Sequence, residues 1–149
     1  MMDAMPSVVD YGEHEAELLL ALDGLRILVV DDNPDARAAL TAVLEECGAD
    51  VVPVESAPAA LDALPRVQPD VMVSDIAMPE MDGRSLIRQV RALDNKHGGA
   101  VPAVAITAYA TPTDCTRTLL AGYQLYLAKP YDPTELVGLI ARLLGRSVL

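Results

Sequence analysis

The chain has 149 residues, 52% of them hydrophobic and 22% charged, which suits one folded domain and excludes bulk disorder. Its 11 basic and 22 acidic residues leave a net charge of -11, which argues against nucleic acid and anionic membrane surfaces as partners. Cys47 and Cys115 are too few for a disulfide scaffold, and no uncharged run is long and apolar enough to span a membrane, so we expect a cytoplasmic protein.

The first 24 residues differ in charge from the rest of the chain. They contain no lysine or arginine but six acidic residues: Asp3, Asp10, Glu13, Glu15, Glu17 and Asp23. We interpret residues 1–24 as an acidic arm or linker, within which residues 14–22 have the composition of a short helix. Such a helix would dock or dimerise, and the alternative is a frayed linker. The sequence predicts one folded domain over residues 25–146 and a short tail at 147–149.

From Leu25 onward, short apolar runs alternate with segments of helical period. The runs predict five strands, over residues 26–30, 50–54, 71–74, 101–106 and 124–128. The segments that follow them predict five helices, over residues 34–47, 56–64, 83–93, 111–122 and 132–145. A proline or a capping residue opens four of these helices: Pro34, Ser56, Thr111 and Asp132. The alternation indicates an α/β fold, a doubly wound parallel sheet with helices on both faces.

Side chains that carry charge or hydrogen bonds follow the predicted strands directly. Asp31 and Asp32 follow the first strand, Asp75 the third, Thr107 the fourth and Lys129 the fifth. The carboxyl ends of parallel strands meet at one edge of a sheet, where ligands bind in open α/β folds. We therefore expect three carboxylates, a hydroxyl and an ammonium group to converge there.

Three carboxylates in close contact need a cation or a proton between them. Two unit charges roughly 4 Å apart repel by about 4 kcal/mol at an effective dielectric constant of about 20. Oxygen ligands with water completing the shell suit Mg²⁺, and a carboxylate beside Mg²⁺ can attack phosphorus to form an aspartyl phosphate. Asp31 and Asp32 could instead cap the helix that follows them.

Four stretches of the sequence resemble the motifs of response regulator receiver domains, the CheY-like modules of two-component systems. They are Ile27-Leu-Val-Val-Asp-Asp-Asn-Pro34, Asp75-Ile-Ala-Met-Pro-Glu-Met-Asp-Gly83, Ala105-Ile-Thr-Ala108 and Tyr126-Leu-Ala-Lys-Pro130. The resemblance covers about residues 25–146. It implies a flavodoxin-like fold with five parallel strands in the order 2-1-3-4-5 and five helices.

The resemblance also implies a phosphoacceptor and a set of metal ligands. Asp75 is implied to be the phosphoacceptor. Asp32 is implied to bind Mg²⁺ directly and Asp31 to hold it through water, while Asp75 and the backbone carbonyl of Ala77 supply further ligands.

Phosphate-binding and switch residues are implied in the same way. Thr107, Ala108 and Lys129 correspond to the residues that bind the phosphoryl group, and Tyr126 to an aromatic residue that swings inward as Thr107 moves. The peptide bond before Pro130 is implied to be cis.

The function implied is that of a signalling module and not of an enzyme, apart from its own phosphorylation and dephosphorylation. A histidine kinase or a histidine phosphotransfer protein would donate the phosphoryl group to Asp75. The added charge would switch a protein-binding surface made by the helix over 111–122, the strand over 124–128 and the last helix, through which the chain could also form a homodimer. A free regulator, a phosphorelay shuttle and the receiver part of a hybrid kinase all fit the sequence.

Two other functions remain open on the sequence alone. The first is a Mg²⁺-dependent phosphohydrolase of the haloacid dehalogenase kind, which needs a second Asp where this chain has Ala77. The second is a receiver-like scaffold that works without phosphate, although the acidic pair, the acceptor and the lysine are all present. Ala77 and Tyr109 are expected to flank the path of the water that hydrolyses the aspartyl phosphate, with opposing effects: the small Ala77 leaves the path open and Tyr109 shields it.

Overall fold

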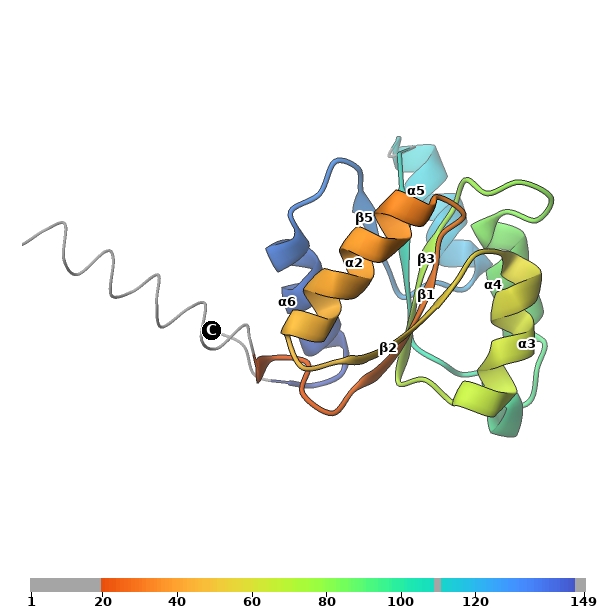
Figure 1. Cartoon of the computed structure of the whole chain (residues 1–149). Helices are drawn as coiled ribbons and strands as arrows, with labels where there is room; N and C mark the ends of the chain where they lie inside the picture. Colours follow the sequence, from red (N-terminus) through yellow and green to blue (C-terminus); the bar gives the residue numbers. More distant parts are fainter. Residues whose placement is uncertain (1–19, 109–110, 147–149) are drawn as a thin grey trace, which may run out of the picture.

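Five parallel strands form one sheet between two layers of helices in the computed structural model of the chain, which describes residues 20–108 and 111–146 (Figure 1). The strands lie in the order β2-β1-β3-β4-β5. Their bounds are β1 Arg26–Val30, β2 Asp50–Val54, β3 Val71–Asp75, β4 Ala103–Thr107 and β5 Leu125–Ala128. The flavodoxin-like order 2-1-3-4-5 expected from the sequence is confirmed.

The α-helices of the described residues are α2 Pro34–Glu46, α3 Ala57–Val67, α4 Gly83–Arg91, α5 Pro112–Ala121 and α6 Pro133–Leu143. A short 3-10 turn, Asn95–His97, precedes β4. Helices α2 and α6 cover one face of the sheet, and α3, α4 and α5 cover the other (Figure 1). The parallel strands require such crossovers, because each strand must return to the same end of the sheet.

Alternate residues of the central strands point into two separate cores. Ile27 and Val29 of β1 pack with residues of α2 and α6, whereas Leu28 and Val30 pack with residues of α3 and α4. Every residue of β3 and β4 is buried. Burial on both faces explains why residues 71–73 of β3 and 103–106 of β4 are continuous apolar runs, without polar alternation.

Side-chain caps fix where the helices begin. Ser56, Thr111 and Asp132 each accept a hydrogen bond from a backbone N–H in the first turn of α3, α5 and α6, so these three predicted starts are confirmed. The cap of α2 is Asn33, whose Oδ1 accepts the N–H of Ala36 at 2.9 Å. Asn33 therefore caps α2, a role that the sequence alone left open for Asp31 and Asp32.

The predicted end of α3 is wrong by three residues. The helix continues past Leu64 to Val67, although Pro65 lies within it. In the last turn the proline removes one backbone hydrogen bond, and the burial of Val67 offsets that loss. Gln68 ends the helix in the left-handed region at φ 51°, with its N–H donating to the carbonyl of Leu64.

Several other predicted bounds change by one to two residues. Helix α4 ends at Arg91, where residue 93 was predicted, and strand β4 begins at Ala103, where residue 101 was predicted. Asp75 and Thr107 are the last residues of β3 and β4, and not the first residues after them. Their backbones are therefore held by the sheet.

The residues just before β1 pack onto the domain. Ala21 and Leu22 are buried in the core beneath α2 and α6, and the N–H of Leu22 donates to the carbonyl of Cys47 at 3.0 Å. Packing thus begins before Leu25, where the boundary was predicted. Residues 1–19 of the predicted acidic arm and the predicted tail at 147–149 lie outside the described residues.

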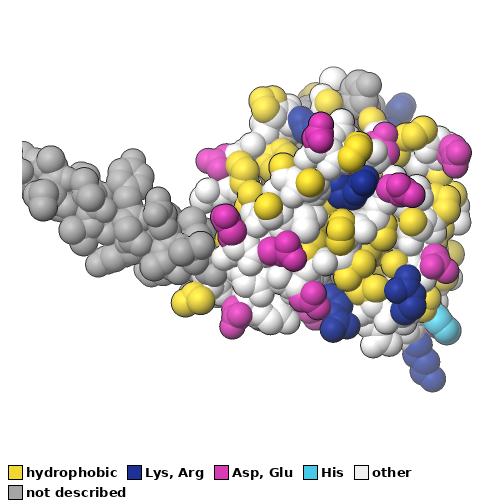
Figure 2. All heavy atoms as spheres, in the orientation of Figure 1, with side chains coloured by type: hydrophobic (Ala, Val, Ile, Leu, Met, Phe, Trp, Pro, Cys, Tyr) yellow, Lys and Arg dark blue, Asp and Glu magenta, His cyan; other side chains and the backbone are white. Residues whose placement is uncertain are grey.

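The surface of the described domain is mixed in charge. On the face shown in Figure 2, acidic and basic side chains are interspersed with apolar ones. None of the helices within residues 20–108 and 111–146 is long and apolar enough to cross a membrane.

Candidate functional site

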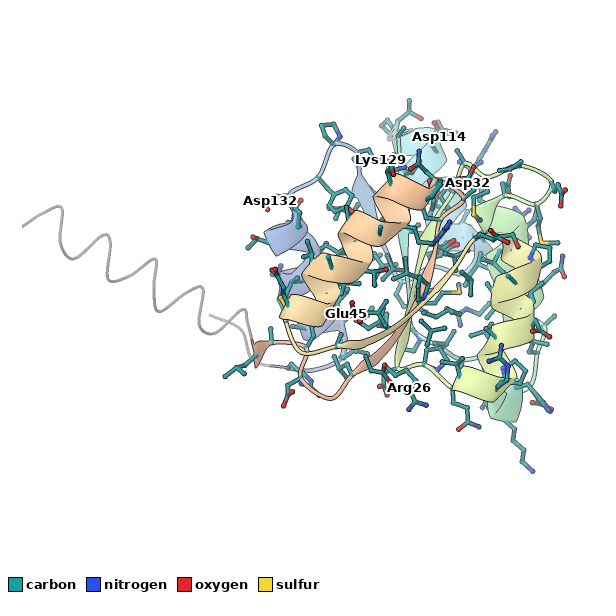
Figure 3. All side chains as sticks on the ribbon, in the orientation of Figure 1. Arg26, Asp32, Glu45, Asp114, Lys129 and Asp132 are labelled. Carbon is teal, nitrogen blue, oxygen red and sulfur yellow. The ribbon has the colours of Figure 1, made fainter. Side chains whose placement is uncertain are left out.

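The carboxyl edge of the sheet brings together the side chains that the sequence placed there. Asp75 ends β3 and pairs in register with Ile106, while Thr107 ends β4 and pairs with Ala128. Lys129 follows directly, and its N–H donates to the carbonyl of Thr107 at 2.8 Å. Figure 3 shows Asp32 and Lys129 at this same edge, beside the first turn of α2. Residues more than 50 positions apart in sequence, such as Asp75 and Lys129, therefore meet because their strands end together.

Three carboxylates form a compact cluster at this edge. Asp31, Asp32 and Asp75 each offer an oxygen atom, and these oxygens all lie within 4.8 Å of one another. Asp31 and Asp75 are buried and Asp32 is exposed. Backbone donors hold two of them in place, because Asn33 donates to Asp31 Oδ1 at 2.9 Å and Ala77 donates to Asp75 Oδ1 at 3.3 Å.

Lys129 supplies the positive charge of the site. Its Nζ donates to Asp75 Oδ2 at 3.0 Å, and the two side chains are 37% and 7% exposed. Burial alone would lower the pKa of Lys129, but the hydrogen bond to Asp75 and the charges of Asp75 and Asp31 raise it overall. The lysine is therefore charged at neutral pH. The Lys129–Pro130 peptide bond is cis.

The acidic cluster has the donor set that Mg²⁺ prefers. Burial is the main cause that raises the pKa of Asp31, and the charges of Asp75 and Asp32 add to it, against the hydrogen bond from Asn33. A raised pKa means that the ionised form is disfavoured in the metal-free protein. Carboxylate oxygens with an open side to solvent at Asp32 suit a cation that keeps several waters, so the residues present fit Mg²⁺.

Asp31→Asn is expected to raise the free energy of unfolding of the metal-free protein by about 1 kcal/mol at pH 7. The folded-state pKa of Asp31 lies above its unfolded value, so stability falls as the pH rises from the unfolded pKa to the raised folded pKa, and the full cost of the ionised carboxylate applies above that. Asparagine removes the charge and keeps an oxygen for the N–H of Asn33. Urea denaturation in the presence of a chelator measures the gain, which should vanish below about pH 4, where the wild-type carboxyl is protonated.

In the presence of Mg²⁺, wild type should become more stable than Asp31→Asn. Binding of the ion stabilises wild type, and Asp31→Asn should lose most of that stabilisation. Asp62→Asn is the matched control, because Asp62 is exposed on α3 away from the cluster, and it should change neither result. A wild-type midpoint that does not move with Mg²⁺ would show that the cluster does not hold this ion.

The remaining predicted site residues differ in exposure. Thr107 is 1% exposed at the end of β4, whereas Ala77 and Ala108 are exposed on the loops after β3 and β4. Tyr126 on β5 is 38% exposed, and its contact with the thiol of Cys115 on α5 raises its pKa. Its ring is therefore on the surface in this structure. Tyr109, predicted to shield the site from water, lies outside the described residues.

Sequence reasoning missed a buried contact that braces the loop after β3. Gly83 at the start of α4 donates its N–H to the carbonyl of Ile76 at 2.8 Å, and its own carbonyl accepts a hydrogen bond from the hydroxyl of Tyr123 at 2.8 Å. Tyr123 is 3% exposed, and burial raises its pKa well above the usual value. Nothing in the local pattern around Tyr123 pointed to this contact, because the partners are 40 residues apart.

Sequence reasoning also missed an ion pair beside the site. Arg84 in the first turn of α4 reaches Asp114 in the first turn of α5, with Nη2 3.4 Å from Oδ1. Asp114 also accepts a hydrogen bond from the hydroxyl of Thr111, the cap of α5. The only signal in the sequence is that Arg84 follows the Asp-Gly that ends the acceptor motif.

The family model of the response regulator receiver domain matches residues 27–141. An uncharacterized 14.6 kDa protein of Leptolyngbya boryana is 49% identical over 114 residues, which are 76% of this chain and 86% of that protein. The sensor histidine kinase GacS of Pseudomonas protegens is 34% identical over 135 residues, which are 90% of this chain and 15% of the kinase. The chain thus spans most of the first relative and only a small part of the second.

Solved structures of receiver domains share the fold. The receiver domain of a sensor histidine kinase from Pseudomonas aeruginosa, with a magnesium ion coordinated in the active site cleft, is 35% identical with a TM-score of 0.74. That match covers 82% of this chain and 98% of the other. The chain is homologous to the receivers of histidine kinases and to response regulators, and the phosphoacceptor role of such receivers in two-component signalling fits its site. It belongs to the response regulator receiver domain family.

Proposed function

We propose that Asp75 accepts a phosphoryl group in a Mg²⁺-dependent reaction and that this modification is the signal that the domain carries. One observation supports this most directly. The buried carboxylate of Asp75 has an oxygen within 4.8 Å of oxygens of Asp31 and Asp32, and its Oδ2 lies 3.0 Å from the ammonium of Lys129. A nucleophile beside both anionic metal ligands and a cation is arranged for phosphoryl transfer.

Each residue of the site has a defined task in this proposal. An oxygen of Asp75 attacks phosphorus while the bond from phosphorus to the donor's histidine nitrogen breaks, and the electron pair leaves with that nitrogen. Asp32, Asp75 and the carbonyl of Ala77 would hold Mg²⁺ directly and Asp31 would hold it through water, and the bound ion would supply positive charge for the phosphoryl oxygens. Further phosphoryl oxygens are bound by the ammonium of Lys129, the hydroxyl of Thr107 and the N–H of Ala108.

Dephosphorylation returns the domain to its starting state. Water attacks phosphorus, the bond to the Asp75 oxygen breaks, and the products are inorganic phosphate and the free carboxylate. Beyond these two reactions of its own side chain we propose no enzymatic activity. The exposed methyl of Ala77 takes the place where a phosphohydrolase of the aspartyl-nucleophile class needs a general acid.

The output surface in this proposal is the face formed by α5, β5 and α6. Phosphorylation shifts Thr107, and the ring of Tyr126 moves inward to fill the space behind it. Three large apolar side chains are exposed on α5 and β5, namely Leu119 at 42%, Leu120 at 81% and Tyr126 at 38%. Apolar exposure of this kind supports a binding role for the face, either to a partner protein or to a second copy of the chain.

The donor in this proposal is a histidine kinase or a histidine phosphotransfer protein in the cytoplasm. Similarity to part of the sensor histidine kinase GacS supports the first of these donors. The net charge of -11 supports the prediction that nucleic acid is not a direct partner.

Intact-protein mass spectrometry tests the proposal. Wild type incubated with acetyl phosphate and Mg²⁺ is expected to gain the mass of one phosphoryl group, and a chelator should prevent the gain. Steady release of phosphate from unrelated phosphoesters would instead indicate a phosphohydrolase. No uptake from either acetyl phosphate or phosphoramidate, which carries a phosphorus–nitrogen bond like phosphohistidine, would contradict the proposal and favour a scaffold.

A further inference from the structure

The ion pair between Arg84 and Asp114 connects the two helices that begin beside the acceptor. Arg84 Nη2 lies 3.4 Å from Asp114 Oδ1, and the two side chains are 20% and 27% exposed. Asp114 Oδ2 also accepts a hydrogen bond from Thr111 Oγ1 at 2.6 Å, and the N–H of Asp114 donates back to that hydroxyl at 3.2 Å. Arg84 therefore holds the carboxylate that closes the cap of α5.

Arg84 is fixed close to the acceptor by its neighbour in the chain. A Cβ on Gly83 would lie 2.6 Å from the carbonyl oxygen of Asp75, so the start of α4 touches the end of β3 directly. The N–H of Gly83 also donates to the carbonyl of Ile76 at 2.8 Å. The backbone of Arg84 therefore has little freedom to move relative to Asp75, and only its side chain can change partner.

Arg84 and the loop after β3 line one cavity of about 450 Å³. Its lining residues are Ile76, Ala77, Met78, Asp82, Arg84 and Asp114. Ala77 lines this cavity and donates its N–H to Asp75 Oδ1, so one lining residue directly contacts the acceptor carboxylate. Arg84 Nε is buried and has no hydrogen-bond partner among the described residues. The guanidinium thus keeps a donor that Asp114 does not use.

Phosphorylation changes the balance of charge around this cavity. A phosphoryl group carries a charge of about -1.5 to -2 and three strong acceptor oxygens, against the single charge of Asp114. Hydrogen bonds from a guanidinium to phosphate oxygens are among the strongest that a side chain makes. The contact with Asp114, at 3.4 Å, is long for a charge-assisted hydrogen bond.

We propose, on the basis of the proposed function, that Arg84 releases the carboxylate of Asp114 and binds the phosphoryl group on Asp75 in its place. The exchange makes Arg84 a further phosphoryl-binding residue of this domain. It also releases Asp114 from α4, so that its carboxylate keeps the hydrogen bond from the Thr111 hydroxyl but loses the link between the two helices. Helix α5 carries the exposed Leu119 and Leu120, so the exchange links the acceptor to the face that binds partners.

Binding of beryllofluoride, a mimic of the phosphoryl group, tests the exchange in the presence of Mg²⁺. Arg84→Met keeps the apolar stem and removes the charge, and it should weaken binding at least about tenfold. Asp114→Asn removes the competitor and should tighten binding a few-fold. Arg84→Lys should recover part of the loss. Arg88→Met is the matched control, because Arg88 is exposed on the same helix, and it should leave binding unchanged.

The double variant Arg84→Met, Asp114→Asn distinguishes a change of partner by Arg84 from a simple effect of net charge on beryllofluoride binding. If charge alone acts, the effects of Arg84→Met and Asp114→Asn add. If Arg84 exchanges partners, Asp114→Asn brings no gain once Arg84 is replaced, because the competition is already gone. Additive effects, or weaker binding in both single variants, would overturn the exchange.

Amide hydrogen exchange in the first turn of α5 gives an independent readout. The amides of Asp114 and Cys115 should exchange faster in wild type once beryllofluoride is bound, because the link to α4 is released. In Arg84→Met they should exchange fast with or without beryllofluoride. Equal binding by wild type and Arg84→Met would overturn the role of Arg84 and leave the proposed function intact. Failure of wild type itself to bind beryllofluoride with Mg²⁺ would count against both.

Discussion

Asp75→Asn is expected to take up no phosphoryl group, whereas wild type takes up one per chain. The amide of asparagine is neutral and a poor nucleophile, and it loses both the charge that attracts Mg²⁺ and the ion pair with Lys129. Its shape is nearly the same, and its oxygen can still accept the N–H of Ala77. The fold should therefore survive. Intact mass after incubation with acetyl phosphate and Mg²⁺ measures the loss.

A second aspartate variant controls for nonspecific acyl phosphate chemistry. Asp62→Asn alters an exposed carboxylate on α3 and should take up one phosphoryl group, as wild type does. If Asp75→Asn still gained one group at a single site, the acceptor would have to be another member of the cluster, Asp31 or Asp32. Mapping of the modified peptide would decide between them.

Gly83→Ala is expected to lower the free energy of unfolding by about 3 kcal/mol. The added Cβ would lie 2.6 Å from the carbonyl oxygen of Asp75 and 2.9 Å from the Cα of Ile76, both of which are backbone atoms of the β3–α4 connection. Backbone atoms cannot move aside as a flexible side chain does. The start of α4 must therefore shift away from β3, which also weakens the hydrogen bond from Tyr123 to the carbonyl of Gly83.

Gly138→Ala is expected to have the opposite effect and to stabilise the chain. Gly138 lies inside α6, and a Cβ there would meet nothing within 4 Å. Alanine should raise the free energy of unfolding by about 0.5 to 1 kcal/mol, because glycine is a poor helix former. Urea denaturation compares both variants with wild type. A Gly83→Ala protein as stable as wild type would show that the connection after β3 can move without cost.

Much of this molecule follows from the sequence by itself. The runs at residues 27–30 and 71–73 are apolar without alternation because their strands are buried on both faces, and that pattern is local. Caps such as Ser56 and Thr111 accept hydrogen bonds from residues three positions further on, so the local sequence also determines where these helices start. Parallel pairing then brings strand ends together, which is why the sequence alone predicts the cluster of Asp31, Asp32 and Asp75.

Only the tertiary structure decides what lies between these elements. Burial of Val67 carries α3 past Pro65, and Leu22 joins the core although its sequence resembles a linker. The bond from Tyr123 to Gly83 and the ion pair from Arg84 to Asp114 join residues 40 and 30 positions apart. Local periodicity and capping carry no information about such distant partners, because packing alone sets which side chains meet across two helices or two loops. The sequence thus determines the sheet and its carboxyl edge, and packing determines which side chains join α4 to α5 and to the residues before β5.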